Sequence, residues 1–146
     1  MSAPPKLVEA ITYVVEHSPR PPGRTLLQKL LYLSDVESVR RTGRSVTGLD
    51  YIAYDHGPWL PQLYDALALA ENLRERRYLW SRGQGYEYEL APGARPRYSL
   101  LTDEDRQVLQ SIASTWGRRP LEDVLAHVYE QSPYEGTPFG APVPLA

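Results

Sequence analysis

Residues 25–43 read TLLQKLLYLSDVESVRRTG, the most strongly patterned stretch of the 146-residue sequence. Leucines at positions 26, 27, 30 and 31 have the spacing that forms one dense apolar face on a helix. Thr25 followed by Gln28 fits a capping box, which predicts the start of this helix, and Gly43 predicts its end. We expect this helix to lie at the centre of the fold.

Proline and glycine divide the chain on either side of this helix. The joint SPRPPGR at residues 18–24 separates it from an earlier helix expected over residues 5–17. After it, LDYIAYD at residues 49–55 predicts a short extended segment that leads into a turn at Gly57–Pro58. A third helix is expected from this turn to about Arg76.

The second half of the chain mixes strand and helix patterns. The alternation of Tyr86, Tyr88 and Leu90 with glutamates predicts a β-hairpin or small sheet within residues 78–101. A second capping box, Thr102 with Asp105, predicts a helix that ends at Gly117, and a last helix is expected over residues 120–129. The predicted fold is therefore α+β, a compact, mostly helical single domain with about five helices and a small β-hairpin or sheet.

The last fifteen residues differ from the rest of the chain. They contain four prolines and two glycines, which oppose any regular element, so this segment is expected to be either disordered or extended against the body, with Phe139 as its anchor. We divide the chain into a domain at residues 1–131 and a proline-rich tail at residues 132–146.

The composition excludes several classes of function. No cysteine is present, which removes disulfides and thiolate chemistry, and the formal net charge of −2 is unlike that of a dedicated nucleic-acid binder. No apolar run approaches the ~18 residues that span a membrane, and the N-terminus lacks a secretory pattern, so we expect a cytoplasmic protein without membrane contact.

Three segments resemble the Panacea domain, also called the SocA-like domain. LLQKLLY at residues 26–32 is similar to a core motif of that family, and GLDYIAYDHGPWLPQLYDAL at residues 48–67 is similar to its tyrosine-rich approach to a Gly-Pro turn. AHVYEQSPY at residues 126–134 resembles its C-terminal histidine motif. The sequence departs from the family at Ala126, where threonine is common, and at Tyr134, where tryptophan is common.

The resemblance implies a function in binding another protein. Panacea domains are antitoxins found beside many unrelated toxins in bacteria and their phages, and at least one member is a proteolytic adaptor that delivers its toxin for degradation. The implied partners are a cognate toxin encoded nearby and, for an adaptor, a protease machine.

The candidate partner-binding residues gather in the first two of these segments. Helical spacing places Gln28 and Tyr32 on one face, and a Gly-Pro turn with large aromatic side chains is typical of recognition loops. A structural role is the alternative. Gln28 would cap its helix, and Lys29 would reach solvent or a carboxylate. Tyr32 would bury its ring with its hydroxyl at the surface, and the ring of Trp59 would fill the core. The candidate set is Gln28, Lys29, Tyr32, Tyr54, Asp55, His56 and Trp59.

DNA binding is the second hypothesis. Residues 18–44 hold six basic residues and two acidic ones, and helices followed by a hairpin could form a winged-helix reader. Arg40, Arg41 and Arg44 would then contact phosphates, with Arg82 of the hairpin in the minor groove. The negative net charge and the hairpin residues Glu87 and Glu89 oppose this, so DNA binding would be secondary.

No motif indicates an enzyme or a cofactor. His17, His56 and His127 fall in separate elements without metal-ligand spacing, and no serine lies in a Gly-x-Ser-x-Gly elbow. The glycines match neither the phosphate-loop nor the dinucleotide pattern. We therefore expect no metal, no cofactor and no catalytic residue, with an uncharacterised hydrolase as a distant third hypothesis.

Overall fold

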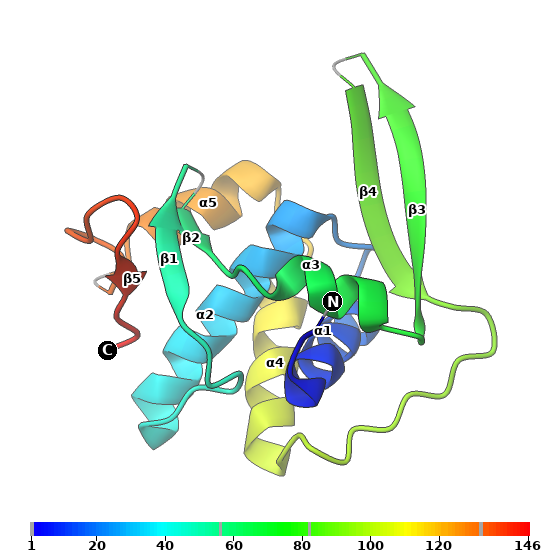
Figure 1. Ribbon diagram of the computed structural model, residues 1–146, viewed down its shortest axis with the longest axis horizontal. Helices are drawn as coiled ribbons and strands as arrows, with labels where there is room; N and C mark the ends of the chain where they lie inside the picture. Colours follow the sequence, from blue (N-terminus) through cyan, green and yellow to red (C-terminus); the bar gives the residue numbers. More distant parts are fainter. Residues whose placement is uncertain (1, 56, 82, 132) are drawn as a thin grey trace.

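The computed structural model describes residues 2–55, 57–81, 83–131 and 133–146. Over these residues five helices and five strands form a compact α+β fold, which confirms the predicted class (Figure 1). In chain order the elements are α1 (Pro5–His17), α2 (Arg24–Thr42), β1 (Tyr51–Tyr54), β2 (Gly57–Trp59), α3 (Leu63–Leu69), β3 (Leu73–Trp80), β4 (Gly83–Leu90), α4 (Asp103–Trp116), α5 (Leu121–Tyr129) and β5 (Pro142–Val143).

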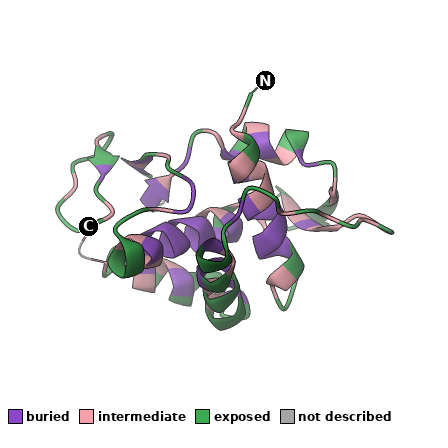
Figure 2. Ribbon diagram, turned by 90° about the horizontal axis from the view of Figure 1, so that it is seen from below, coloured by how far each residue is buried: buried purple, intermediate pink, exposed green. Residues whose placement is uncertain are grey.

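Helix α2 is the central element, as predicted. It packs against α1, α4 and α5 and contacts β2 and β4, so it is buried around most of its circumference (Figure 2). Its N-cap is Gly23, and no side chain caps it. The capping box predicted from Thr25 and Gln28 is therefore wrong, because the Gln28 Oε1 atom accepts a 2.8 Å hydrogen bond from the backbone N–H of Leu60 instead.

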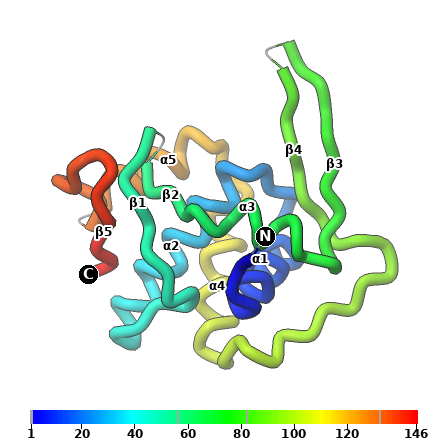
Figure 3. The backbone as a smooth tube through the Cα atoms, in the orientation of Figure 1, coloured from blue at the N-terminus to red at the C-terminus, as the bar shows by residue number. Residues whose placement is uncertain are grey.

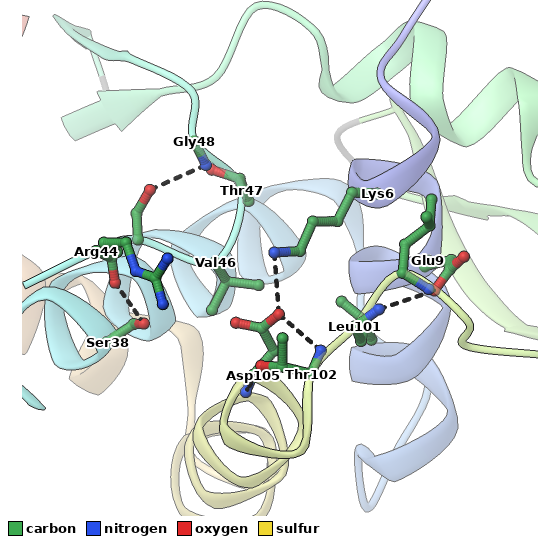
Figure 4. A network of polar contacts seen from close by, with 12 residues as sticks. Lys6, Glu9, Ser38, Arg44, Val46, Thr47, Gly48, Leu101, Thr102 and Asp105 are labelled. Carbon is green, nitrogen blue, oxygen red and sulfur yellow. Dashed lines mark hydrogen bonds and ion pairs between the residues drawn. The ribbon is translucent and has the colours of Figure 1, made fainter. Parts of the chain in front are cut away.

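The capping box at the start of α4 is confirmed. The Thr102 side chain accepts from the Asp105 backbone at 3.0 Å, and the Asp105 carboxylate accepts from the Thr102 backbone at 2.9 Å. Figure 4 shows the Lys6 amine of α1 beside the same carboxylate, at 3.0 Å. These contacts fix α4 against α1 on one side of the core.

A buried aspartate ties the C-terminal half of α2 to β1. Asp35 is fully buried and accepts four hydrogen bonds, from the backbone N–H groups of Val46 and Thr47 and from the hydroxyls of Thr47 and Tyr51, at 2.6–3.0 Å. Burial raises the pKa of Asp35 above its ordinary value, although these hydrogen bonds oppose the shift. The network orders the loop between α2 and the first sheet.

The first sheet places the Gly-Pro segment on the body. Strand β1 lies between β2 and β5 and pairs antiparallel with both, with Tyr54 opposite Gly57 and Tyr51 opposite Val143. Gly57 and Pro58 thus belong to a strand and do not only form the predicted turn. Gly57 has φ +96°, a backbone conformation that residues other than glycine rarely adopt.

The second sheet is a long hairpin of β3 and β4 that projects from the body (Figures 1 and 3). The predicted strand around Tyr86 and Tyr88 is confirmed, but the predicted limits are wrong: the hairpin spans residues 73–90, and the Pro-Gly break at residues 92–93 follows it. The predicted third helix is also too long, since α3 ends at Leu69. Residues 73–80 are a strand because each of them pairs with β4, an interaction absent from local sequence patterns.

Arg24 at the start of α2 holds the base of this hairpin. Its Nε atom donates to the Tyr88 hydroxyl at 2.8 Å, and its Nη2 atom donates to Glu75 at 3.2 Å. The guanidinium also lies 3.8 Å from the ring centroid of Tyr86. Hydrogen bonding by Tyr88 and Arg24 lowers the pKa of Glu75 below its ordinary value.

The C-terminal segment is extended along β1, one of the two expected alternatives. Strand β5 pairs with β1, and Val143 is buried. The expected anchor, Phe139, stacks on Tyr54 at 5.3 Å between ring centroids but remains 69% exposed. The division into residues 1–131 and 132–146 stays a prediction.

Candidate partner-binding site

A pocket of about 190 Å³ opens between α2, the β1–β2 hairpin and α3. It brings together five of the seven predicted partner-binding residues: Gln28, Lys29, Tyr54, Asp55 and Trp59. Thr25, Gly57 and Tyr64 complete its lining. His56, another predicted residue, lies outside the described residues.

Lys29 is the unusual group of this pocket. The side chain is buried, and its Nζ atom donates a 2.7 Å hydrogen bond to the backbone carbonyl of Pro58. Burial lowers the pKa of Lys29 to about 8. The sequence alternatives for Lys29 were solvent or a carboxylate; within the described part of the chain its amine contacts a neutral carbonyl and forms no ion pair.

Aromatic rings form the wall of the pocket on the side of the first sheet. Tyr54 is 47% exposed, and its ring centroid lies 5.1 Å from that of Trp59. Phe139 also stacks on the Tyr54 ring, so the rings of Trp59, Tyr54 and Phe139 form a continuous surface beside the pocket. Exposed aromatic groups of this kind dominate many protein interfaces.

Tyr32, the remaining predicted residue, lies in the core. It is fully buried and packs edge-on against Tyr51 at 5.3 Å between ring centroids. Its hydroxyl has no hydrogen-bond partner among the described residues, and burial raises its pKa above the ordinary value. In this conformation Tyr32 packs in the core between α2 and β1 and offers no surface to a partner.

The three segments that carry the family resemblance meet at Gly57. A Cβ atom placed on Gly57 would lie 3.5 Å from the Lys29 Nζ atom and 3.6 Å from the Cε1 atom of Tyr129. Lys29 belongs to the first segment, Gly57 to the second and Tyr129 to the third. Gly57 therefore lies in van der Waals range of both α2 and α5, and its positive φ is what favours glycine there.

Sequence reasoning missed Thr25 and Tyr64 as parts of the site. Thr25 was interpreted as a helix cap, whereas it is exposed at the rim of the pocket. Tyr64 falls in the helix expected after the Gly-Pro turn and was not among the candidate residues, but it is 56% exposed and lines the pocket from α3. No local signal could have shown this, because Tyr64 reaches the pocket through the tertiary position of α3, which packs on α1 and brings the Tyr64 ring 5.1 Å from the Arg24 guanidinium of α2.

The predicted DNA-contacting arginines lie elsewhere. Arg40 and Arg41 are near the C-terminus of α2, and both pair with Glu37, at 2.6 and 2.9 Å. Arg44 follows in the exposed loop near Ser38 and Val46 (Figure 4). The β3–β4 hairpin contacts Arg24 near the other end of this 19-residue helix, about 24 Å from Arg40 along its axis. Arg82 lies outside the described residues.

The described residues form neither a metal cluster nor a membrane-spanning helix. No cluster of three or more histidine, aspartate or glutamate side chains has the geometry of a metal site there. None of the helices in the described part of the chain combines the length and apolar character needed to cross a membrane.

Comparison with known proteins agrees with these observations. Residues 27–133 match the family described as "Antitoxin SocA-like, Panacea domain". This matched range includes all five pocket residues predicted from the sequence. No curated protein and no solved structure matches the sequence. The matched region covers most of the chain and contains most of α2, the β1–β2 and β3–β4 hairpins and α5. This protein therefore belongs to the SocA-like Panacea antitoxin family.

Proposed function

We propose that this protein is an antitoxin that binds and neutralises a toxin protein encoded nearby in the same genome, and that it acts in the cytoplasm. The pocket surface formed by Gln28, Lys29, Tyr54, Asp55 and Trp59 is the proposed contact. Exposed tyrosine and tryptophan rings beside a small pocket suit protein recognition. The role is binding and not catalysis.

The convergence of α2, β2 and α5 at Gly57 carries this proposal. The residues that resemble the family are far apart in the sequence, and they meet beside one partly exposed pocket. A purely structural role would explain their packing, but it would not explain why exposed Tyr54, Asp55 and Tyr64 surround the same pocket.

Coexpression with the neighbouring gene tests the proposal. The neighbouring gene alone should arrest growth, and coexpression of this protein should restore it. Size-exclusion chromatography of the coexpressed proteins should then show a complex. A harmless neighbour, or rescue without any physical association, would contradict the proposal.

The same strains distinguish masking from delivery to a protease. If the antitoxin masks the toxin, toxin abundance should stay constant or increase during rescue. If it is an adaptor, toxin abundance should fall, and rescue should fail in a strain that lacks the responsible protease. Immunoblots of the toxin over time provide this measurement.

A further inference from the structure

We propose that the pocket beside Lys29 receives the carboxylate of an acidic side chain from the partner protein, with Lys29 as its counter-ion. This inference rests on the proposed function for the identity of the partner. It adds the chemistry that the partner must present. The argument depends on the hydrogen-bonding capacity of the groups that line the pocket.

The amine of Lys29 has unused capacity. An ammonium group carries three N–H donors, but one acceptor, the carbonyl of Pro58, contacts it among the described residues. Lys29 is only 1% exposed, and a buried cation without an anionic partner is costly. With a pKa of about 8 the amine is mostly charged at pH 7, so an incoming carboxylate would find a cation there.

Other donors line the same pocket. The Oε1 atom of Gln28 accepts from Leu60, which leaves its side-chain NH₂ group to donate to a ligand. The Thr25 hydroxyl lies at the rim, in the first turn of α2, where the helix dipole also favours a negative charge. These groups match the acceptor-only character of a carboxylate.

One lining group opposes an anion. Asp55 also lines the pocket, but it is exposed and forms no ion pair within the described residues. Solvent screens the repulsion between an exposed carboxylate and a ligand more effectively than it screens contacts inside the pocket. We therefore expect Asp55 to weaken binding without preventing it.

The size of the pocket favours a single side chain. About 190 Å³ is too small for a helix, and the rings of Tyr54, Trp59 and Tyr64 can enclose the methylene groups of one glutamate-sized side chain. Chain-terminal carboxylates are commonly captured by consecutive backbone N–H groups, whereas this pocket offers mainly side-chain donors. The proposed ligand is therefore a side-chain carboxylate.

The chain offers a direct measurement, because it contains only two lysines, Lys6 and Lys29. In protein labelled with ¹³C-lysine, NMR should show two Cε signals, and Lys6, which pairs with Asp105, supplies an internal control. The probes are N-acetylglutamate N-methylamide, which carries only a side-chain carboxylate, its neutral glutamine analogue, and N-acetylalanine, which carries only a terminal carboxylate.

The glutamate probe should shift the Lys29 signal saturably, with a dissociation constant of ~1 mM or weaker, and should raise the pKa of Lys29 by about 1. The glutamine analogue should not shift it, and Lys6 should respond to none of the probes. A stronger response to N-acetylalanine would assign the pocket to a chain terminus and overturn the proposal.

Equal responses to the glutamate and glutamine probes, or no saturable response of Lys29 to the glutamate probe, would also overturn the proposal. This measurement uses the unbound wild-type protein, so it does not depend on toxin neutralisation. If the glutamate probe binds but coexpression shows no rescue, the proposed function fails and the carboxylate site remains. If coexpression restores growth but the glutamate probe does not bind, the carboxylate site fails and the proposed function remains.

Discussion

The Lys29 Nζ atom donates its 2.7 Å hydrogen bond to Pro58, a residue 29 positions later in the chain. This contact joins the N-terminal half of α2 to β2 at the proposed binding pocket. The amine therefore has a structural partner on one side and lies beside the pocket lining at Gly57 on the other. Changes at Lys29 should therefore affect both stability and recognition.

The first prediction concerns the pH dependence of stability. In the folded chain the Lys29 pKa is about 8, compared with 10.5 for an ordinary lysine. Between these values the unfolded chain holds a proton that the folded chain has released, so the free energy of unfolding should rise with pH. The contribution of Lys29 should increase by ~1.4 kcal/mol from pH 7 to pH 9.

Urea unfolding of the wild-type protein and the Lys29→Met variant at both pH values checks this. The difference between the two proteins should change by about that amount, while contributions from the nearby groups Asp55, Tyr54, Tyr64 and Tyr129 largely cancel. A difference that stays constant from pH 7 to pH 9 would mean that Lys29 has an ordinary pKa in the folded chain.

The second prediction concerns Asp35. Replacing Asp35 by alanine would leave four buried donors without an acceptor, and we expect a loss of ~3–5 kcal/mol in the free energy of unfolding. Asp35→Asn keeps an acceptor for the N–H groups of Val46 and Thr47 and should cost clearly less. Thermal and urea unfolding measure both variants; equal losses would show that the charge matters more than the hydrogen bonds.

The third prediction concerns Gly57. Gly57→Ala should destabilise the protein by ~1–2 kcal/mol because of its positive φ, and the added methyl group would lie 3.5 Å from the Lys29 amine. Gly48→Ala is the matched control, since Gly48 has φ +69° but no heavy atom within 4 Å of an added Cβ. If the pocket binds the toxin, Gly57→Ala should reduce affinity more than Gly48→Ala at similar stability.

The two capping-box patterns show what the sequence could and could not predict. Thr102 and Asp105 cap α4 as expected, because both partners lie within the same turn. Thr25 and Gln28 have the same spacing, yet Gln28 instead bonds to Leu60, 32 residues away. Local patterns predict local hydrogen bonds unless a distant backbone group competes for the same side chain.

The same reasoning applies to the hairpin and the site. Strand β3 contains Arg74, Glu75, Arg76 and Arg77, which carry no apolar alternation, and only pairing with β4 makes it a strand. The family resemblance located five pocket residues, but Tyr64 joins them through the tertiary position of α3, which packs on α1. The structural alternative for Tyr32, a buried ring, is the one observed, although its hydroxyl is buried as well, whereas Gln28 in the same motif lines the pocket.

The fourth prediction concerns DNA. Arg40 and Arg41 already pair with Glu37, so DNA affinity should be weak and should decrease steeply as salt increases. Electrophoretic mobility shifts or fluorescence anisotropy with the protein's own promoter region measure this. Nanomolar binding at physiological salt that is lost in the Arg40→Ala, Arg41→Ala double variant would support the winged-helix hypothesis instead.

The last prediction locates the toxin-binding surface. Tyr54→Ala removes an exposed ring from the pocket rim, so it should weaken toxin binding with little loss of stability; a dominant contact would cost ~2 kcal/mol or more in binding free energy. Asp55→Ala removes a carboxylate that repels the proposed acidic ligand, so it should leave toxin binding unchanged or strengthen it. Trp59→Ala tests a more buried ring, and its thermal stability must be measured in parallel because loss of a packed aromatic side chain costs ~3–5 kcal/mol in a core.

Trp80→Ala is the matched control for these variants, because Trp80 is 52% exposed on the projecting hairpin and does not line the pocket. Growth rescue and complex formation should fail in at least one pocket variant that remains folded, while Trp80→Ala should behave like the wild-type protein. If every loss of rescue follows unfolding, the pocket residues only support the fold. If Trp80→Ala alone abolishes rescue while folded, the toxin binds the hairpin, because that substitution changes the exposed aromatic surface of β3 without altering the groups around Lys29.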